Sequence, residues 1–340
     1  MEALLQELCA AAGVNGVSQA AELLASKLAA YVPQVHTDAM GNVWGVRPSG
    51  NENAPTLLLE AHVDEIGFIV TDVLDNGFLR VAPCGGADAR TLAAQPVVVL
   101  CEPPLNGVFC STPPHLSGGD EALLKIEERG IDVGLPADEA RARIPLGTRV
   151  MFAPRFDRLL GDRVCAKALD DRAGCAAILR TLALVKDKAL PWNVAVLFCV
   201  QEELGTRGAG PAAFALEPEA AIAVDVSFAH TPDANRATCG VLGGGVMLGV
   251  SPVLDEAITK QLRTLAQQHD IPLQYEGMGG KTGTDADAIT VARAGIPTGL
   301  LSIPLRYMHT PVEVASLSDI EAVAALMAAF AEEGTVQGNA

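Results

Sequence analysis

The sequence predicts an α/β protein with a central, mostly parallel sheet, helices on both of its faces, and a small inserted β-rich domain. Short apolar runs alternate with amphipathic stretches of helical length in residues 1–66 and again in residues 160–340, a rhythm typical of strands joined by helices. Residues 67–159 instead contain short alternating runs separated by glycine turns. With 340 residues, the chain is long enough for two domains of roughly 100–200 residues each.

The strands predicted for the larger domain, residues 1–66 and 160–340, are uninterrupted apolar runs, which are typical of strands buried on both faces. We expect them at Leu57–His62, Val194–Val200, Ala220–Val226 and Pro297–Ile303. Apolar residues that recur every three or four positions predict helices between these strands. The helices are expected at Ala20–Tyr31, Arg172–Val185, Leu254–Gln268 and Ser318–Ala331.

The insertion, residues 67–159, is predicted to be a small barrel or sandwich. Its expected strands are Gly67–Val73, Phe78–Pro83 and Pro96–Cys101, and the turn Asp75-Asn76-Gly77 separates the first two. One helical piece is expected at about Ala137–Arg143.

Charge and composition exclude several classes of partner. A net charge of −17 disfavours binding to nucleic acid or to anionic membranes. No run approaches the roughly 18 apolar residues that span a membrane, and the N-terminus lacks the basic region of a signal peptide, so a cytoplasmic location is expected. The high apolar content, 49%, predicts apolar surface buried between subunits, as in a homo-oligomer. Eight cysteines without a C-x-x-C pair argue against a disulfide framework and a zinc ribbon.

The first candidate site residues are His62 and Asp64, at the end of the first predicted strand. Open α/β sheets place their sites at the carboxyl ends of strands, and alternation puts these two side chains on one side of the chain. A metal-binding histidine often needs a carboxylate that fixes its tautomer, a role that fits Asp64. The alternative is an ordinary hydrogen-bonded histidine.

Two adjacent acids, Asp170 and Asp171, stand just before the helix predicted from Arg172. An aspartate there caps the free backbone N–H groups of the first turn. Because capping requires only one of the two acids, the other is available to bridge two cations.

Glu202 and Glu203 follow the strand Val194–Val200, and Asp225 closes the next strand. Neighbouring glutamates at the end of a buried strand are unfavourable unless they are paired or bound to metal. One glutamate would then bind metal while the other moves protons. The alternatives are a solvated loop for the glutamates and a turn residue for Asp225.

Among six histidines, only His62 and His309 fall at the ends of core strands within polar clusters, and His230 is the one spare candidate. His62, Asp170, Asp225, His309 and one glutamate supply five nitrogen and oxygen ligands and leave one glutamate free. This set suits two zinc, cobalt or manganese ions.

Taken together, these motifs resemble those of the M42 metallopeptidases, the glutamyl and leucyl aminopeptidases that form tetrahedral dodecamers. The segments that carry the resemblance are Ala61-His62-Val63-Asp64-Glu65-Ile66-Gly67, Lys167-Ala168-Leu169-Asp170-Asp171-Arg172, Gln201-Glu202-Glu203-Leu204-Gly205, Asp225-Val226, Gly283-Thr284-Asp285-Ala286 and Arg306-Tyr307-Met308-His309-Thr310-Pro311. They extend over most of the chain.

The resemblance implies a metal-dependent aminopeptidase that releases N-terminal residues from peptides through a water activated by two metal ions. Glu202 would be the general base, and Asp64 would orient His62. The insertion, residues 67–159, would be a dimerisation domain, and dimers would assemble into a twelve-subunit particle. The implied ligand sets are His62, Asp170 and Asp225 for one metal, and Asp170, Glu203 and His309 for the other, with Asp170 bridging.

Substrate contacts are expected from Lys281, Asp285 and Arg306. Lys281 departs from the family pattern in the run Gly279–Gly283, and Lys281 or Arg306 could pair with an acidic N-terminal side chain of the substrate. The alternative is that Arg306 is structural and Lys281 solvated.

Three other functions remain open at this point. The nearest is another two-metal amide hydrolase on the same scaffold, such as a deacylase or a carboxypeptidase. A non-catalytic assembly protein would not need the complete site, and a metal-binding or storage module would not need the free glutamate.

Overall fold

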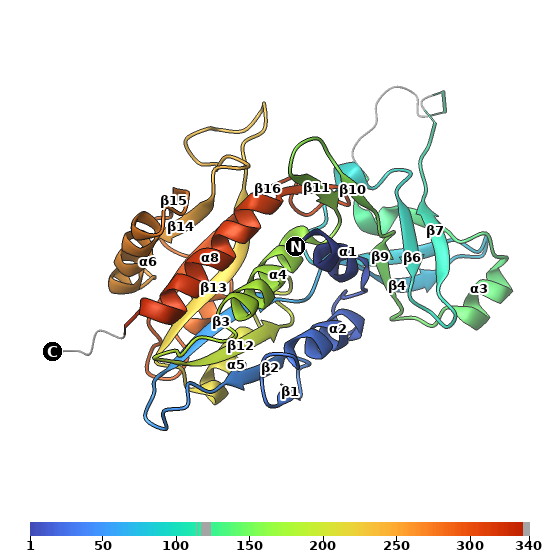
Figure 1. The fold of residues 1–340 in the computed structure, drawn as a ribbon. Helices are drawn as coiled ribbons and strands as arrows, with labels where there is room; N and C mark the ends of the chain where they lie inside the picture. The colour runs from blue at the N-terminus through green and yellow to red at the C-terminus, as the bar shows by residue number, and fades with distance from the viewer. Residues whose placement is uncertain (114, 117–123, 336–340) are drawn as a thin grey trace.

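The computed structural model describes residues 1–113, 115–116 and 124–335 and consists of a large sheet domain beside a small closed barrel (Figure 1). The helices are α1 (Glu2–Ala10), α2 (Gln19–Leu28), α3 (Ala137–Arg143), α4 (Leu169–Leu184), α5 (Ala209–Leu216), α6 (Glu256–Gln268), α7 (Ala286–Ile289) and α8 (Leu317–Glu333). The short 3-10 turns are η1 (Ala89–Thr91) and η2 (Ile126–Glu128). No helix in the described residues is long and apolar enough to cross a membrane.

The large sheet has 11 strands, of which nine follow the order β1-β2-β12-β3-β13-β16-β17-β11-β10, while β14 joins β16 and β15 joins β14. These strands are β1 (Val35–Thr37), β2 (Val43–Arg47), β3 (Thr56–His62), β10 (Phe156–Arg158), β11 (Arg163–Ala166), β12 (Asn193–Cys199), β13 (Ala220–Phe228), β14 (Val246–Val250), β15 (Leu273–Gly277), β16 (Thr298–Arg306) and β17 (Glu313–Ser316).

This sheet is mixed, which corrects the expectation of a mostly parallel one. The inner strands β12, β3, β13 and β16 run parallel, as predicted, but β1, β2, β17, β11 and β10 on either flank pair antiparallel. Connections such as those from β10 to β11 and from β16 to β17 are too short for a crossover, so they join antiparallel neighbours.

The register of the parallel strands brings their carboxyl ends to one edge of the sheet. His62 on β3 pairs with Cys199 on β12, and Asp225 on β13 pairs with Ser302 on β16. The loops that follow β3, β12, β13 and β16 therefore leave the sheet on the same side, as expected for an α/β site.

Helices cover both faces of the large sheet. The larger apolar layer lies under α1, α2, α4, α6 and α8, which form the near side in Figure 1. The smaller layer packs α5 and α7 on the opposite face. Ile178 of α4 and Val323 of α8 are fully buried in the first layer, and Ala213 of α5 is fully buried in the second. The two apolar layers keep the sheet rigid at the edge where its parallel strands end.

The insertion forms a closed barrel in the order β4-β5-β8-β7-β6-β9. Phe68 packs edge-to-face against Phe109 and Phe152 in its apolar interior. The last barrel strand ends at Phe152, and the next strand, β10, already belongs to the large sheet. The barrel strands are β4 (Gly67–Val73), β5 (Leu79–Cys84), β6 (Pro96–Val99), β7 (Leu105–Phe109), β8 (Gly130–Asp132) and β9 (Arg149–Phe152).

Candidate metal centre and active-site cavity

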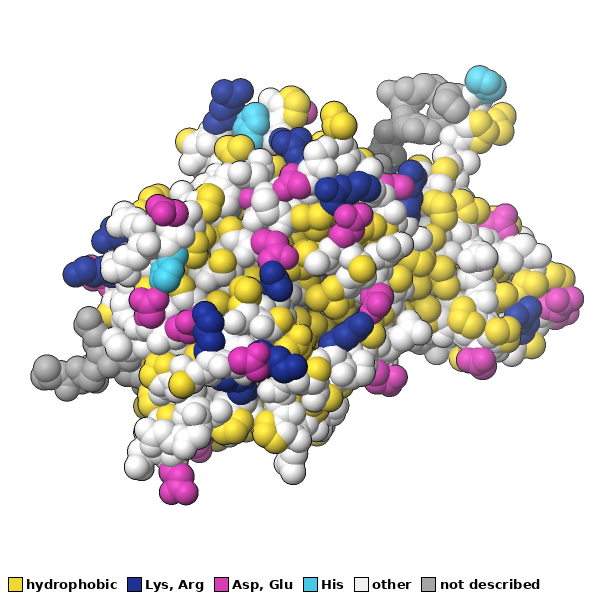
Figure 2. Space-filling model, in the orientation of Figure 1, with side chains coloured by type: hydrophobic (Ala, Val, Ile, Leu, Met, Phe, Trp, Pro, Cys, Tyr) yellow, Lys and Arg dark blue, Asp and Glu magenta, His cyan; other side chains and the backbone are white. Residues whose placement is uncertain are grey.

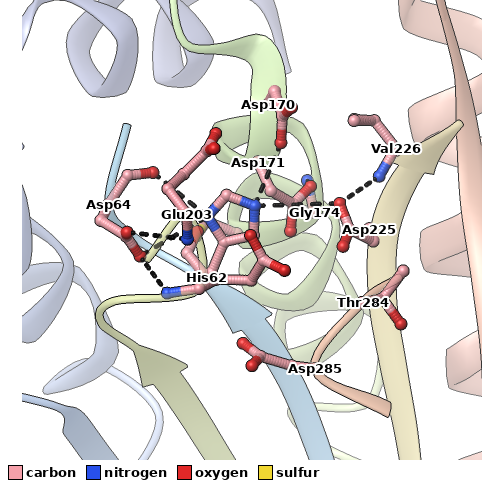
Figure 3. A network of polar contacts seen from close by, with 12 residues as sticks. His62, Asp64, Asp170, Asp171, Gly174, Glu203, Asp225, Val226, Thr284 and Asp285 are labelled. Atoms are coloured by element: carbon pink, nitrogen blue, oxygen red, sulfur yellow. Dashed lines mark hydrogen bonds and ion pairs between the residues drawn. The ribbon is translucent and has the colours of Figure 1, made fainter. Parts of the chain in front are cut away.

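The first candidate ligand group surrounds His62 at the end of β3 (Figure 3). His62 Nε2 lies 3.0 Å from Asp170 Oδ1 and 3.8 Å from Asp225 Oδ1. His62, Asp171 and Asp225 each present one potential ligand atom, and these atoms lie within 4.8 Å of one another. The structure thus brings together side chains from β3, β13 and the start of α4.

The second group contains His309, Glu203 and Asp170, which also present ligand atoms within 4.8 Å of one another. His309 Nε2 lies 3.4 Å from Asp170 Oδ2 and 3.5 Å from Glu203 Oε2. Asp170 therefore turns one carboxylate oxygen toward His62 and the other toward His309. This is the arrangement required of a carboxylate that bridges two ions.

The start of α4 divides two tasks between its adjacent acids. Asp171 Oδ1 accepts a hydrogen bond of 2.9 Å from the backbone N–H of Gly174, which is the capping interaction. A Cβ on Gly174 would come within 2.3 Å of Asp171 Oδ2, so glycine is required there. Because Asp171 satisfies the first turn, Asp170 is left to face the two histidines.

The backbone fixes the rings of both histidines. His62 Nδ1 donates to the carbonyl oxygen of Asp64 at 3.1 Å, whereas the nearest Asp64 carboxylate oxygen is 3.7 Å away. His309 Nδ1 donates to the carbonyl oxygen of Gly86, also at 3.1 Å. A Cβ on Gly86 would lie 2.7 Å from His309 Nδ1, so only glycine permits this approach. Each ring thereby keeps its Nε2 directed at the carboxylates.

The carboxylate of Asp64 holds the two glutamates in place. It accepts hydrogen bonds from the backbone N–H groups of Glu202, at 3.1 Å, and Glu203, at 3.2 Å. Asn15 Nδ2 donates to the same carboxylate at 2.9 Å. Asp64 is thus buried between the first ligand and the loop that carries the predicted base, and it positions both.

Burial of so many acids in one place perturbs their ionisation. Burial, followed by repulsion from Asp170, raises the pKa of Glu203 to about 8. Burial also raises the pKa values of Asp171 and Asp225 well above their ordinary range. Hydrogen bonding to Asp170 raises the pKa of His309 to about 9. The causes are those expected of clustered acids removed from water.

The donor set fits divalent cations. Asp171 Oδ2 and Glu203 Oε1 are buried and have no hydrogen-bond partner among the described residues. Unpartnered carboxylate oxygens cost free energy unless a cation binds them. Histidine nitrogen and carboxylate oxygen are ligands that zinc, cobalt and manganese accept.

A cavity of about 510 Å³ opens beside the two groups. Asp170, Glu203, Asp225 and His309 line one side, together with Glu202. Burial raises the pKa of Glu202 to about 7, and this glutamate belongs to neither ligand group. The cavity can therefore hold a substrate against both groups and against a carboxylate that is free to exchange a proton.

None of the three residues expected to contact substrate is among those that line the cavity. Arg306 Nε donates to the backbone carbonyl oxygen of His230 at 2.7 Å, and Lys281 is exposed and does not line the cavity. Asp285 is 2% exposed and lies near Cys199 and Glu60, with Asp285 Oδ2 2.6 Å from Cys199 Sγ. His230 Nε2 accepts from Arg236, and His230 joins neither ligand group.

Comparison with known proteins identifies the family. The profile described as M42 glutamyl aminopeptidase matches residues 41–326. The chain belongs to the M42 peptidase family. A lysyl aminopeptidase of Pyrococcus furiosus is 33% identical over 338 residues, which cover 97% of this chain and 96% of the relative. A glutamyl aminopeptidase of Lactococcus lactis is 27% identical, with coverage of 93% and 90%.

Solved structures of M42-type peptidases share the fold. An aminopeptidase from Desulfurococcus kamchatkensis matches with a TM-score of 0.92 at 32% identity and covers 98% of this chain and 95% of its own. The TET1 peptidase of Pyrococcus horikoshii, described as assembling into a tetrahedron or a large octahedral shell, matches with a TM-score of 0.85 at 30% identity, with coverage of 97% and 99%. This M42 chain is therefore an aminopeptidase by family.

Sequence reasoning missed three features of this M42 site. Asp171 was left without a role because nothing in one sequence tells which of two adjacent acids caps the helix. Gly86 was not singled out, although the pair Gly85-Gly86 leaves room for the side chains of Glu203 and His309 to approach the backbone. Glu276, which also lines the cavity, lies on the short strand β15 that was not predicted.

Proposed function

We propose that this M42 aminopeptidase uses two divalent metal ions bound by His62, Asp170, Glu203, Asp225 and His309, with Glu202 as general base. The observation that carries the proposal is the orientation of Asp170, whose two carboxylate oxygens face the two different histidines. When bound, zinc, cobalt or manganese ions would polarise the scissile carbonyl and make the attacking water more acidic.

Glu202 is suited to move the proton of the hydrolytic reaction. It lines the cavity next to the ligand groups but belongs to neither of them. A carboxylate at this position can accept a proton from the attacking water and release it to the leaving amine. The hydrogen bond from its backbone N–H to Asp64 fixes its distance from His62.

Replacing Glu202 tests this assignment. Glu202→Gln keeps the size of the side chain and removes its basicity, so kcat should fall by roughly 10²–10⁴-fold while bound metal stays unchanged. Amino-acid anilide turnover and metal content by mass spectrometry measure the two quantities. Glu52→Gln, on an exposed loop away from the cavity, is the matched control. Normal turnover by Glu202→Gln would remove Glu202 from the base role.

The requirement for a free N-terminus separates an aminopeptidase from the alternative amide hydrolases. The cavity is lined by several carboxylates, which attract the α-ammonium group of a peptide. Matched peptides with free and acetylated N-termini should differ sharply in rate. A deacylase or carboxypeptidase would cleave the acetylated peptide at least as well.

We also propose that the protein is a homo-oligomer in which the barrel joins dimers, and that these dimers form a dodecamer. On the face drawn in Figure 2, hydrophobic side chains are spread over the barrel, and Val108, Leu124 and Leu146 of the insertion are exposed. Light scattering on the purified protein distinguishes a monomer, a dimer and a dodecamer. The cytoplasmic location stays a prediction from sequence.

A further inference from the structure

The active-site cavity contains a carboxylate that belongs to neither ligand group. Glu276 of β15 lines the cavity, together with Ser227 of β13 and Ser302 of β16. Ser302 is the register partner of Asp225, and Ser227 follows Asp225 by two positions on the same strand. Glu276 thus lies on the wall next to the metal edge, where the first side chain of a bound peptide would extend.

Two buried hydroxyl groups hold this carboxylate in place. Ser302 Oγ donates to Glu276 Oε2 at 3.0 Å, and Ser227 Oγ donates to Oε1. Ser227 and Ser302 are 6% and 1% exposed. A carboxylate has about four acceptor positions, so two remain after the serine hydroxyls have bound. The half-buried carboxylate can direct its two unused acceptor positions into the cavity that it lines.

Glu276 has no cationic partner within the described part of the chain. None of the ion pairs formed by lysine, arginine or histidine side chains there includes it. Its neighbours on the wall are neutral hydroxyls and apolar groups, so its charge is not offset locally. A positively charged ligand group would provide the missing partner.

The remaining lining residues suit an unbranched aliphatic side chain. Val226, Phe228, Leu300 and Met308 add apolar surface to the cavity that the ligand groups and Glu276 line. Apolar walls that end in one charged acceptor are the pattern that binds the methylene chain and the terminal cation of lysine or arginine. An acidic side chain would be repelled by the carboxylate of Glu276.

We propose that Glu276 determines specificity for the first residue of the substrate, and that the enzyme prefers peptides beginning with lysine or arginine. This inference rests on the proposed aminopeptidase function of the cavity. It reverses the charge preference considered for Lys281 and Arg306, neither of which lines the cavity. Ser227 and Ser302 are positioning residues for the carboxylate.

Lysine and norleucine anilides test the proposal on the unmodified holoenzyme, because their side chains differ chiefly by the terminal ammonium group. We expect kcat/KM for the lysine substrate to exceed that for norleucine by at least about tenfold, and glutamate anilide to be the poorest substrate. Equal rates for lysine and norleucine, or a preference for glutamate, would overturn the assignment of Glu276.

The variant Glu276→Gln removes the charge and keeps the size of the side chain; one serine hydroxyl can still donate to the amide oxygen, and the other can turn to accept from the amide nitrogen. We expect kcat/KM for lysine and arginine anilides to fall by about 100-fold, while norleucine changes by less than about threefold. Glu52→Gln removes one surface charge and should leave both rates unchanged. A parallel loss for lysine and norleucine would mean that Glu276 binds the α-amine or only supports the fold, and it would refute the specificity role.

These outcomes are separable from failure of the proposed function. A holoenzyme that cleaves no amino-acid anilide would refute the aminopeptidase site itself. A holoenzyme that cleaves them without regard to the terminal charge would refute only the role of Glu276. The comparison of lysine with norleucine on the unmodified protein remains decisive if Glu276→Gln fails to fold.

Discussion

The barrel and the sheet domain differ in what they bury. Within its described residues, the barrel buries only hydrophobic side chains, with Phe68, Phe109 and Phe152 at its centre. The sheet domain buries lysine, arginine, histidine and many carboxylates, most of them near one edge. The buried carboxylates are Glu60, Asp64, Glu65, Asp170, Asp171, Asp225, Asp285, Glu313 and Asp319.

Both domains have apolar cores, and this difference concerns the site edge that only the sheet domain has. Buried apolar side chains stabilise by about 25 cal/mol per Å² of area removed from water, and they need no partner. Buried carboxylates are unfavourable unless a hydrogen bond, a cation or a proton compensates them. The barrel should therefore be stable by itself, whereas the order of the site edge should depend on what is bound there.

The largest expected effect follows from removing the metal ions. Dialysis against a chelator should abolish anilide cleavage, and zinc, cobalt or manganese should restore it. Without cations the ligand groups repel one another, so hydrogen exchange should rise in the loops carrying Asp170, Glu203 and His309 and stay constant in the barrel. Full activity after verified metal removal would contradict the two-metal proposal. An equal rise of hydrogen exchange in the barrel would contradict the difference between the barrel and the site edge.

The second test perturbs the barrel instead of the site, by creating a cavity in its apolar interior. Phe109→Ala removes a 1% exposed side chain that contacts Phe68, and we expect a loss of about 3–5 kcal/mol in the free energy of unfolding of the barrel. Anilide turnover per folded molecule should change little below the unfolding transition. Denaturant unfolding monitored alongside turnover measures both, with exposed Val108→Ala as the control. A stability unchanged by Phe109→Ala would show that the barrel core is not tightly packed.

The smallest expected effect concerns Asp319, at the start of α8. It accepts hydrogen bonds from the backbone N–H groups of Gly243 and Gly245, and burial raises its pKa from 3.8 to about 6. The folded chain therefore holds this proton more tightly than the unfolded chain. The stabilisation is fully present below pH 3.8 and is lost as the pH rises through 6.

Asp319→Asn should accordingly remove a pH-dependent contribution of about 1–1.5 kcal/mol between pH 5 and pH 8. Urea unfolding of both proteins at several pH values measures the difference. Asp88→Asn, near the barrel, is the control, because hydrogen bonding to Arg90 lowers the pKa of Asp88 and keeps it ionised over this range. A stability difference between Asp319→Asn and the unmodified protein that does not vary with pH would contradict this account.

The sequence predicted the central elements because each carries a strong local pattern. The strand expected at Val194–Val200 is β12, Asn193–Cys199, and the helix expected at Arg172–Val185 is α4, Leu169–Leu184. The flanking strands were not predicted, since three or four residues such as those of β1 or β17 are too few for a period to emerge. Without them, the antiparallel flanks of the sheet could not be anticipated.

The candidate site was predictable where its residues end predicted strands. The two histidines, Glu203 and Asp225 converge because parallel strands end at one edge, and Asp170 reaches them from the start of α4. Glu276 could not be placed in the same way, because β15 reaches the cavity only through its pairing with β14. The hydrogen bond between the His309 ring and the Gly86 carbonyl is tertiary, and its partners are far apart in sequence.

The hydrogen bond between the Gly86 carbonyl and the His309 ring limits how far the protein can be shortened. The insertion enters and leaves the sheet domain at neighbouring points, since Phe68 of β4 pairs with Val150 of β9. The chain could therefore be closed by a short turn with the barrel deleted. The shortened protein would retain every ligand side chain. His309, however, would lose the Gly86 carbonyl that keeps the proton on Nδ1. The smallest working version of this catalyst must include at least the loop around Gly86.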